Sequence, residues 1–310
     1  MAYAVVMGEA LVDLLETRAE GGGERVYREA VGGAPLNVAV GLARLGSSVE
    51  FVGSLGDDVL ADRIRTFLDS AGVSTRGCVN AGGPTTLALT TFDGAEPDFH
   101  FYGEPPSYGR LRPADLDRDM VAGAGALYCG SIALLCPDAL DAARAAWAVP
   151  GPLRTFDPNV RPRLLTDPAG YRAVVDEFAA TADLVKLSAA DAATLYDLEP
   201  AAAGARLLEA GAGAVVVTLG ARGALVLCGS ARVRVEAPAV RAVDATGAGD
   251  ATMAALVHGL LVRGRPPAEA EGWAEVAAFA TAVAALACEA RGGATAMPTL
   301  EAVRKRFPHT

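Results

Sequence analysis

The sequence has few of the residues that build metal centres, disulfide frameworks or nucleic-acid surfaces. It contains three histidines and five cysteines in 310 residues, and no two cysteines form a C-x-x-C pair, so a zinc site is not expected. The cysteines are odd in number and lie mostly in apolar patterns, which favours small core residues in a reducing compartment. The formal net charge is -10 and Lys and Arg form no runs, so no nucleic-acid partner is expected.

No segment predicts a signal peptide or a membrane span. The apolar N-terminus lacks a basic region and is interrupted by Glu9 and Asp13. Residues 120–137 carry no charge, but their glycines, Ser131 and the closing Cys-Pro pair favour a buried strand and a turn. The apolar run at residues 276–288 is too short to cross a bilayer and predicts a core helix. We therefore expect a cytoplasmic protein without membrane contact.

Strand and helix patterns alternate along most of the chain, as expected of an α/β fold. Apolar strand patterns occur at residues 2–8, 49–53, 126–129, 154–156, 184–187 and 214–218. Helical patterns occur at residues 34–45, 57–70, 138–147, 169–180, 201–210 and 250–262. The alternation predicts a mostly parallel central sheet that is covered by helices on both faces. The sequence contains no repeat and no interdomain linker, so residues 1–310 are expected to form one domain.

Two stretches interrupt the alternation and predict a small β-sheet that stands off the main domain as a lid. Residues 14–31 contain Gly21-Gly22-Gly23 between β-like pieces, and residues 85–103 contain Thr-rich strands joined by Asp93-Gly94. Such a lid would exclude water from a phosphoryl group. Residues 85–91 are expected to form an exposed edge of this sheet, and exposed edges are usually paired or covered. We therefore expect a homodimer formed through the lid sheets.

The segment Asp244-Ala245-Thr246-Gly247-Ala248-Gly249-Asp250 precedes a long apolar helical pattern. Glycines just before a helix let free backbone N–H groups converge on an anion. A carboxylate beside that anion, at Asp250, can take a proton from a hydroxyl group that attacks a phosphate. The segment is not a Walker P-loop, and alone such a pattern is more often a plain turn and helix cap. The chemistry it suggests is phosphoryl transfer to an alcohol.

Three further motifs lie where a parallel sheet can bind ligands. Gly32-Gly33-Ala34-Pro35-Leu36-Asn37 combines close backbone approach, a proline suited to a helix start, and an amide that donates and accepts. Gly8-Glu9-Ala10-Leu11-Val12-Asp13 places Asp13 just beyond the first strand. Thr218-Leu219-Gly220-Ala221-Arg222-Gly223 is a glycine turn after a later strand and suits a nucleotide. Taken singly, each also fits an ordinary loop, a solvated acid in a hairpin or a strand connection.

Together these residues resemble the ribokinase (PfkB) family of carbohydrate kinases, in the family's order and over nearly the whole chain. The resemblance begins with Gly32-Gly33 and Asn37, continues through residues 43–46 and 52–58, and ends with Asp244 to Asp250. Residues 156–162, Phe-Asp-Pro-Asn-Val-Arg-Pro, are similar to the fructokinase branch. The resemblance implies a three-layer α/β/α fold with a small β-sheet lid. It also implies transfer of the γ-phosphoryl group of ATP, with Mg²⁺, to a sugar or nucleoside hydroxyl.

The resemblance further implies roles for individual residues. The general base would be Asp250. The anion hole would be formed by the backbone of Gly247, Ala248 and Gly249. The sugar would be held by Asp13, Gly32, Gly33 and Asn37. The nucleotide site would be lined by Thr218, Gly220 and Gly223, and a monovalent cation such as K⁺ would be held with the help of Asp244 and Thr246.

Two basic residues each have two interpretations. Arg161 follows a strand and could reach the sugar or the transferred phosphate, or it could form a surface pair with Asp157 or Asp167. Lys186 could contact the nucleotide or form a similar pair. Both are therefore candidates, Arg161 for the sugar site and Lys186 for the nucleotide site.

Two departures from the family's pattern concern the metal and the sugar. The family's Asn-x-x-Glu motif organises Mg²⁺ through water, and Ser188 and Asp191 stand in its place. A carboxylate is kept at Asp191, although it is one methylene shorter. Fructokinase-like members often carry an Arg after the Phe-Tyr pair of the lid, whereas Gly103 follows Phe101-Tyr102 in this chain. One sugar contact is therefore missing.

The sequence thus predicts an ATP-dependent sugar kinase that phosphorylates fructose or a related keto sugar at a primary hydroxyl. 2-Keto-3-deoxygluconate, ribose and a nucleoside stay open as acceptors, because a few pocket side chains decide the acceptor. A sugar- or nucleotide-binding sensor without catalysis also stays open. The altered Ser188 and Asp191 motivate that alternative, and the retained Asp250 argues against it.

Overall fold

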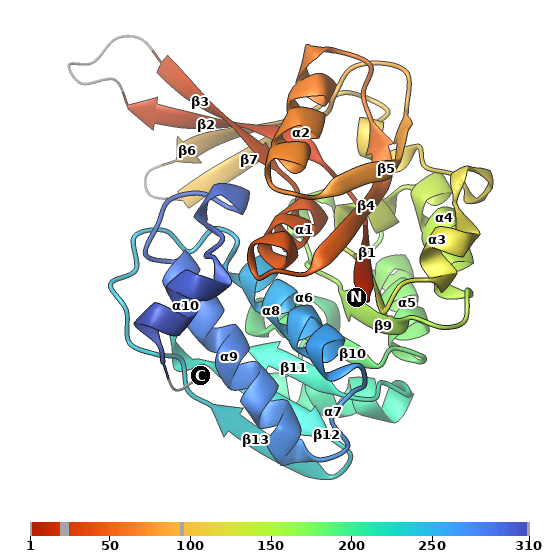
Figure 1. Ribbon diagram of the computed structural model, residues 1–310. Helices are drawn as coiled ribbons and strands as arrows, with labels where there is room; N and C mark the ends of the chain where they lie inside the picture. The colour runs from red at the N-terminus through yellow and green to blue at the C-terminus, as the bar shows by residue number, and fades with distance from the viewer. Residues whose placement is uncertain (1, 19–24, 94–95, 309–310) are drawn as a thin grey trace.

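A nine-stranded sheet forms the centre of the computed structural model, which describes residues 2–18, 25–93 and 96–308 (Figure 1). Its strand order is β13-β12-β11-β10-β9-β8-β1-β4-β5. The strands are β1 (Tyr3–Met7), β4 (Ser48–Leu55), β5 (Ser74–Asn80), β8 (Ala126–Gly130), β9 (Leu153–Asp157), β10 (Leu184–Ser188), β11 (Val215–Thr218), β12 (Ala224–Cys228) and β13 (Ala231–Val235). Neighbours from β5 to β11 run parallel, and β12 and β13 extend the β11 edge in antiparallel fashion. The predicted, mostly parallel sheet is confirmed, while β5, β12 and β13 are additions to the predicted strands.

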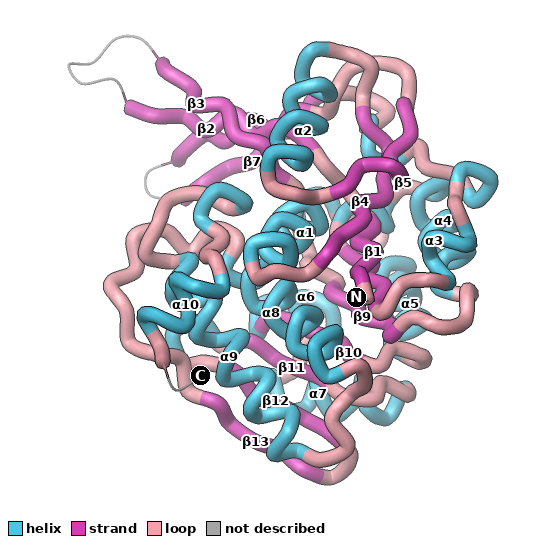
Figure 2. Tube along the Cα trace, viewed as in Figure 1, coloured by secondary structure: helices cyan, strands magenta, loops and turns pink. Residues whose placement is uncertain are grey.

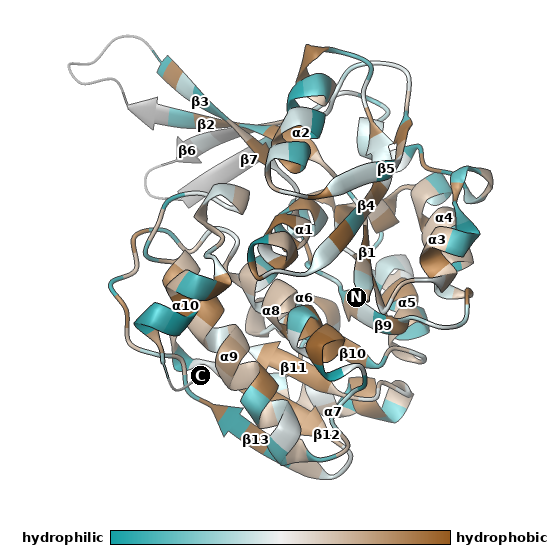
Figure 3. Ribbon diagram, viewed as in Figure 1, coloured by the Kyte–Doolittle hydropathy of each residue, from teal (hydrophilic) through white to brown (hydrophobic). Residues whose placement is uncertain are grey.

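Helices cover both faces of this sheet, because its strands alternate apolar side chains between two cores. Ala4 and Val6 of β1 belong to one core, and Val5 and Met7 belong to the other. The first core lies beneath α1 (Ala34–Arg44), α2 (Val59–Ser70), α8 (Ala248–Arg263), α9 (Ala270–Ala287) and α10 (Leu300–Arg306). The second lies beneath α3 (Arg118–Ala122), α4 (Pro137–Trp147), α5 (Pro168–Ala179), α6 (Ala189–Tyr196) and α7 (Pro200–Ala210). Figure 3 shows the apolar strands β10 and β11 between these layers.

Helix α9 is the one helix in the described part of the chain that is long and apolar enough to cross a membrane. It packs against α8, β12 and β13, and 56% of it is buried within the protein. Such burial is typical of a core helix, as the apolar run at residues 276–288 predicts.

A second sheet of four strands stands off the main domain and is called the lid sheet (Figures 1 and 2). Its strands are β2 (Leu11–Arg18), β3 (Arg25–Gly32), β6 (Leu87–Asp93) and β7 (Glu96–Tyr102), in the order β3-β2-β6-β7. Strand β2 follows β1 after three residues, so the chain passes directly from the main sheet into the lid. The predicted small sheet is confirmed, and it begins at Leu11 rather than at residue 14.

The order of the lid strands corrects one expectation. Strand β6 lies between β2 and β7, so residues 85–91 do not form an exposed edge; the edge strands are β3 and β7. An alternating pattern predicts a strand but carries no information on its neighbours, which explains the error. The predicted turns at Gly21-Gly22-Gly23 and Gly94 lie outside the described residues.

Helices α1 and α8 pack directly against each other, because small residues meet at their contact. A Cβ atom on Gly41 of α1 would lie 2.7 Å from the Cβ atom of Ala254 on α8, so only glycine fits at this spacing. Asn37 and Asp250 stand one helical turn earlier on the two helices, and their side chains share a hydrogen bond of 2.7 Å. The helix contact therefore sets the distance between two predicted site residues.

Replacing Gly41 by alanine is expected to push α1 away from α8 and to lower the free energy of unfolding by about 1–3 kcal/mol. Urea denaturation followed by circular dichroism measures the change. Ala254→Gly in the same chain removes the opposing methyl group, so the double variant should be more stable than the sum of the single effects. Additive effects of the two substitutions would contradict the contact.

Candidate active site

A cavity of about 410 Å³ lies between the carboxyl ends of the main-sheet strands and the lid sheet. The loops after β1, β8 and β9, the lid strands, and the first turns of α1 and α8 supply its walls. It is lined by Glu9, Leu11, Asp13, Gly33, Ala34, Asn37, Ala88, Phe101, Ser131, Ile132, Arg161, Pro162, Arg163, Leu164, Thr246, Gly247 and Asp250. Open α/β sheets bind ligands at this edge. The cavity brings together predicted residues from both ends of the chain.

Asp250 stands on the first turn of α8 and is buried. Its Oδ2 accepts a hydrogen bond from Asn37 Nδ2 at 2.7 Å, and its Oδ1 accepts one from Asn159 Nδ2 at 3.4 Å. Burial raises the pKa of the Asp250 carboxyl, and the Asn37 hydrogen bond and the charges of Lys186 and Arg161 oppose that rise. A carboxylate with a raised pKa at the wall of a cavity is suited to accept a proton.

Backbone donors collect at the start of α8, which begins at Ala248, two residues earlier than predicted. Gly247 precedes the helix with a left-handed φ of 76°, and a Cβ atom on it would lie 3.0 Å from Gly293 Cα, so this position requires glycine. The N–H groups of Gly249 and Asp250 have no partner within the helix, because they lie in its first turn. The Ala248 N–H instead donates to the Ala245 carbonyl at 3.2 Å.

A buried ion pair lies next to these donors. Lys186 Nζ on β10 donates to Asp157 Oδ2 at the end of β9 at 2.7 Å, and both side chains are buried. Burial raises the pKa of Asp157 to about 6, and the Lys186 charge opposes that rise. A Cβ atom on Gly249 would lie 3.2 Å from Lys186 Nζ. Lys186 therefore places a positive charge beside the first turn of α8.

Glu9, after β1, connects two walls of the cavity. Its Oε1 accepts hydrogen bonds from the Ala34 N–H at 3.1 Å and the Ser131 hydroxyl at 2.7 Å, and its Oε2 accepts one from the Ala133 N–H at 3.3 Å. Burial raises the pKa of Glu9 to about 7 against the effect of these bonds. The carboxylate thus fixes the first turn of α1 relative to the loop after β8. The only sequence signal for this role is an acid at the end of an apolar strand.

Two acceptors in the cavity are suited to hydroxyl groups. Asp13 on β2 lines the cavity, and burial raises its pKa to about 6 while Arg161 opposes the rise. Gly32 lies so close to it that a Cβ atom would be 2.1 Å from Asp13 Oδ2. The buried Oδ1 of Asn37 has no hydrogen-bond partner among the described residues. A ligand with several hydroxyl groups carries the donors that these oxygens lack.

Three of the predicted nucleotide residues lie outside this cavity, at the end of β11 and before β12: Thr218, Gly220 and Gly223. Thr218 ends β11, and a short 3-10 turn, Gly220–Arg222, leads towards β12. A Cβ atom on Gly223 would lie 2.0 Å from the Val235 carbonyl oxygen, so glycine is required there. In sheet order, β10 with Lys186 lies between β11 and the strands whose loops line the cavity.

Asp191, the predicted Mg²⁺ contact, holds hydrogen bonds within the chain. Its Oδ2 accepts from the N–H and the hydroxyl of Ser188, both at 2.7 Å, and its Oδ1 accepts from the Val160 N–H at 2.9 Å. Ser188 in turn caps α6 through the Asp191 N–H at 3.0 Å. The pair therefore ties the start of α6 to the loop after β9, and its contact with Mg²⁺ stays a prediction.

Asp244, the predicted contact of a monovalent cation, lies in the loop before α8. Its Oδ1 accepts from the Thr246 N–H and its Oδ2 from the Gly292 N–H, both at 2.9 Å. These bonds join the loop to the segment after α9. They leave further lone pairs on the carboxylate, and its contact with K⁺ stays a prediction.

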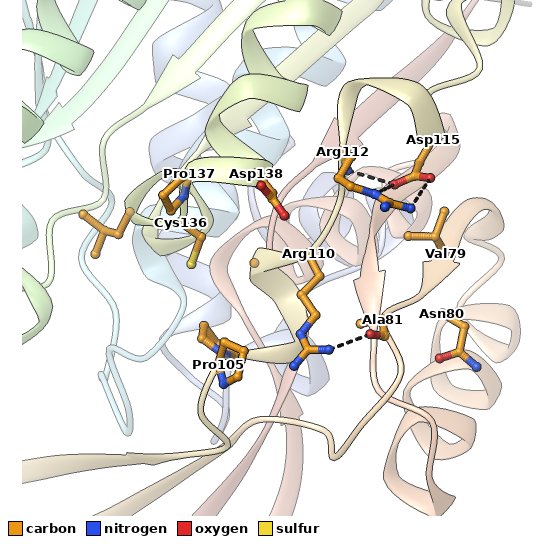
Figure 4. A pocket seen from close by; sticks show the side chains of 13 residues that line it. Val79, Asn80, Ala81, Pro105, Arg110, Arg112, Asp115, Cys136, Pro137 and Asp138 are labelled. Atoms are coloured by element: carbon orange, nitrogen blue, oxygen red, sulfur yellow. Dashed lines mark hydrogen bonds and ion pairs between the residues drawn. The ribbon is translucent and has the colours of Figure 1, made fainter.

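A larger hollow of about 620 Å³ lies beside β5 and the start of α4 and contains none of the predicted site residues (Figure 4). Arg112 pairs with Asp115 at its wall. Arg110 Nη1 donates to the carbonyl groups of Ala81 and Gly82 at 2.9 Å and 2.7 Å. These cations therefore serve contacts within the chain.

Comparison with known sequences shows a similarity to carbohydrate kinases over nearly the whole chain. The profile described as pfkB family carbohydrate kinase matches residues 1–300. Probable fructokinase-6, chloroplastic, of Arabidopsis thaliana is 32% identical over 316 residues, which cover 98% of this chain and 82% of that protein. Fructokinase-1 of Oryza sativa subsp. japonica is 31% identical over 305 residues, which cover 95% and 94% of the two chains.

Solved structures give a matching result. The structure of fructokinase with bound ATP from Xylella fastidiosa has a TM-score of 0.88 and 28% identity, and the match covers 99% of this chain and 98% of that one. Aminoimidazole riboside kinase from Salmonella enterica, complexed with aminoimidazole riboside and an ATP analogue, has a TM-score of 0.85 and 26% identity over 99% and 100% of the two chains.

The stability of the protein should depend on pH through Glu9. The fold raises the Glu9 pKa from 4.5 to about 7, so its stabilising contribution is complete below about 4.5 and is lost as the pH rises through about 7. Between these values the melting temperature of the wild type should fall relative to that of Glu9→Gln. Glu209→Gln, an exposed change on α7, is the control. Parallel curves for the wild type and Glu9→Gln would contradict the assignment.

Proposed function

The chain belongs to the pfkB family of carbohydrate kinases and is an ATP-dependent sugar kinase, and we propose that it phosphorylates fructose or a related keto sugar at a primary hydroxyl. The observation that carries the proposal is the Asn37–Asp250 hydrogen bond at the wall of the cavity. This hydrogen bond places a buried carboxylate and an amide next to the first turn of α8, at the wall of the cavity. The fructokinase relatives at about 32% identity support the keto sugar.

Asp250 acts in this proposal as the general base. It takes the proton of the acceptor hydroxyl, whose oxygen then attacks the γ-phosphorus of ATP. Charge on the phosphoryl oxygens is held by the N–H groups at the start of α8 and by the neighbouring Lys186. Asp250 lies on the first turn of the same helix, so base and anion hole keep a fixed distance.

The acceptor is held by Asp13, by the Oδ1 of Asn37 and by Arg161. Asp13 and Asn37 offer acceptors for hydroxyl groups, and Phe101 and Ile132 offer apolar contact for the C–H face of a sugar. Three carboxyl groups line the cavity beside two guanidinium groups, and this balance disfavours an acceptor that carries its own carboxylate. This favours a neutral sugar over 2-keto-3-deoxygluconate.

The nucleotide lies on the β11 side of Lys186, next to Thr218, Gly220 and Gly223. No group of three or more potential metal-binding side chains occurs among the described residues. Mg²⁺ is usually held by substrate phosphates together with one or two carboxylates, so in this proposal the metal arrives with ATP. Asp191 is the proposed water-bridged contact of Mg²⁺, and Asp244 and Thr246 are the proposed contacts of K⁺.

A phosphorylation screen with ATP and Mg²⁺, with and without K⁺, tests the acceptor. Fructose should give the highest kcat/KM in a panel with ribose, 2-keto-3-deoxygluconate and nucleosides. A higher value for any of these would replace fructose as the proposed acceptor. Sugar binding without consumption of ATP on any member would support the non-catalytic sensor instead.

Asp250→Asn is expected to keep the fold and to lower kcat by about 10²- to 10⁴-fold, because the amide cannot take the hydroxyl proton. A coupled assay of ADP release measures the change. Asp69→Asn, the same replacement at an exposed site on α2, is the matched control and should retain full activity. A near-wild-type rate for Asp250→Asn would remove the general-base role.

We also propose that the chain forms a homodimer through its lid sheet. The edge strand β3 exposes Val26 and Tyr27, at 48% and 37% of their surfaces, on a sheet that stands off the main domain. Light scattering at micromolar concentration should give twice the chain mass of 31.6 kDa. Tyr27→Asp should lower that mass. A monomeric mass for the wild type would contradict the proposal.

A further inference from the structure

The loop after β9 is anchored on both sides of Asn159. Tyr171 Oη donates to the Pro158 carbonyl at 2.6 Å, and the Val160 N–H donates to Asp191 Oδ1 at 2.9 Å. The Asn159 N–H itself donates to Asp157 Oδ1 at 3.1 Å. Every residue from 158 to 160 therefore has a fixed backbone contact, and the Asn159 side chain starts from a defined position.

The orientation of the Asn159 amide follows from its neighbours. Arg161 Nη1 donates to Asn159 Oδ1 at 2.6 Å, and a guanidinium group can only donate. The amide oxygen therefore faces Arg161, and the amide nitrogen faces Asp250, where Nδ2 lies 3.4 Å from Oδ1. The amide thus lies between a cation and the carboxylate.

We propose that Asn159 is a positioning residue for Asp250, and that Oδ1 of Asp250 is the oxygen that takes the acceptor proton. The inference rests on the proposed general-base role of Asp250. Asn37 holds Oδ2 at 2.7 Å, whereas Asn159 directs Oδ1 through a longer contact of 3.4 Å. The weakly held oxygen can form a shorter hydrogen bond with a sugar hydroxyl.

Phosphoryl transfer brings one proton to that oxygen of Asp250. The hydroxyl proton moves to Asp250 Oδ1, and the hydroxyl oxygen forms the new bond to the γ-phosphorus. The bond from that phosphorus to the β,γ-bridging oxygen breaks, and ADP leaves with the electron pair. Asp250 is left as a neutral carboxylic acid, to which the Asn159 amide is still a compatible neighbour.

The charges around Asp250 make the identity of residue 159 important. Lys186 on β10 and Arg161 after β9 are cationic, and Asp157 at the end of β9 is acidic. Asn37 on α1 contributes a neutral donor, and Tyr128 on β8 contributes a buried hydroxyl. A neutral donor at position 159 leaves the charge around Asp250 unchanged. A carboxylate in place of the amide, 3.4 Å from Asp250 Oδ1, would oppose ionisation of Asp250.

The backbone also restricts the choice at this position. Asn159 has a φ of 41°, in the left-handed region that glycine, asparagine and aspartate tolerate best. Glycine would keep the backbone and remove the amide, and aspartate would keep the shape and reverse its polarity. Asn159→Gly and Asn159→Asp therefore separate the role of the amide from that of the fold.

Steady-state kinetics over a pH range test the proposal. Asn159→Asp should move the acid limb of kcat/KM to higher pH by about one unit or more, because the added charge raises the pKa of Asp250 and the base works only when ionised. Asn159→Gly should lower kcat about tenfold with little change in KM for ATP. Asn80→Asp, the same replacement on β5 outside the cavity, where the side chain contacts Asp57 and the Gly82 N–H, should change neither.

Two results would overturn the inference. One is an acid limb of Asn159→Asp that coincides with that of the wild type. The other is a lower melting temperature for both variants with unchanged turnover per folded molecule, which a purely structural role would give.

A second measurement separates this inference from the proposed function. The ¹³C shift of the Asp250 carboxyl carbon, identified by its loss in Asp250→Asn, follows protonation without any turnover. Its midpoint should rise in Asn159→Asp, and an unchanged midpoint would also overturn the inference. Failure of the wild type to phosphorylate any sugar would remove the proposed function and leave this comparison intact.

Discussion

The hydrogen bond between Asn37 and Asp250 exists because α1 and α8 touch through Gly41 and Ala254 with no larger side chain between them. One turn beyond that contact, both helices begin at the same cavity. Each helix start carries unsatisfied N–H groups and a partial positive charge. Glu9 occupies the start of α1, and the start of α8 stays available for an anion. A packing contact in the core thus arranges two electrostatic sites at the surface of one cavity.

The cavity and its surroundings contain more carboxyl groups than cations, and each carboxyl group has a different set of hydrogen-bond or ion-pair partners. Glu9 accepts hydrogen bonds from three donors, Asp157 forms an ion pair with Lys186, and Asp250 accepts hydrogen bonds from two amide groups. Asp13 lies on the lid sheet at the wall of the cavity, where an incoming ligand meets it. Burial raises the pKa of each of these carboxyl groups, so the site favours partners that donate protons. Sugar hydroxyl groups have this property.

Strand and helix patterns predict the main sheet, and the resemblance to the carbohydrate kinases predicts that Asp13, Asn37 and Asp250 share one site, as the cavity shows. Glu9 and Asn159 lie within motifs that the sequence shows, but their contacts with Ala34 and Asp250 do not follow from those motifs, since the partners lie 25 and 91 residues away. The order of the lid strands does not follow from the sequence patterns for a similar reason. Alternation identifies a strand, whereas pairing depends on contacts between distant segments. The structural reason for a single glycine, such as Gly41, becomes visible only in the fold, where another segment lies too close for a Cβ atom.

The separation of 213 positions between Asn37 and Asp250 has a consequence for synthesis of the protein on the ribosome. All nine strands of the main sheet leave the ribosome before α8 and α9, which cover one of its faces. Until these helices emerge, the apolar face of the sheet and of α1 lacks its cover, and such intermediates are prone to aggregation. Asp250 and the free N–H groups of the first turn arrive with α8, one of the two helices that complete this core. The candidate site is therefore completed at the same stage of synthesis at which the apolar face of the sheet is covered.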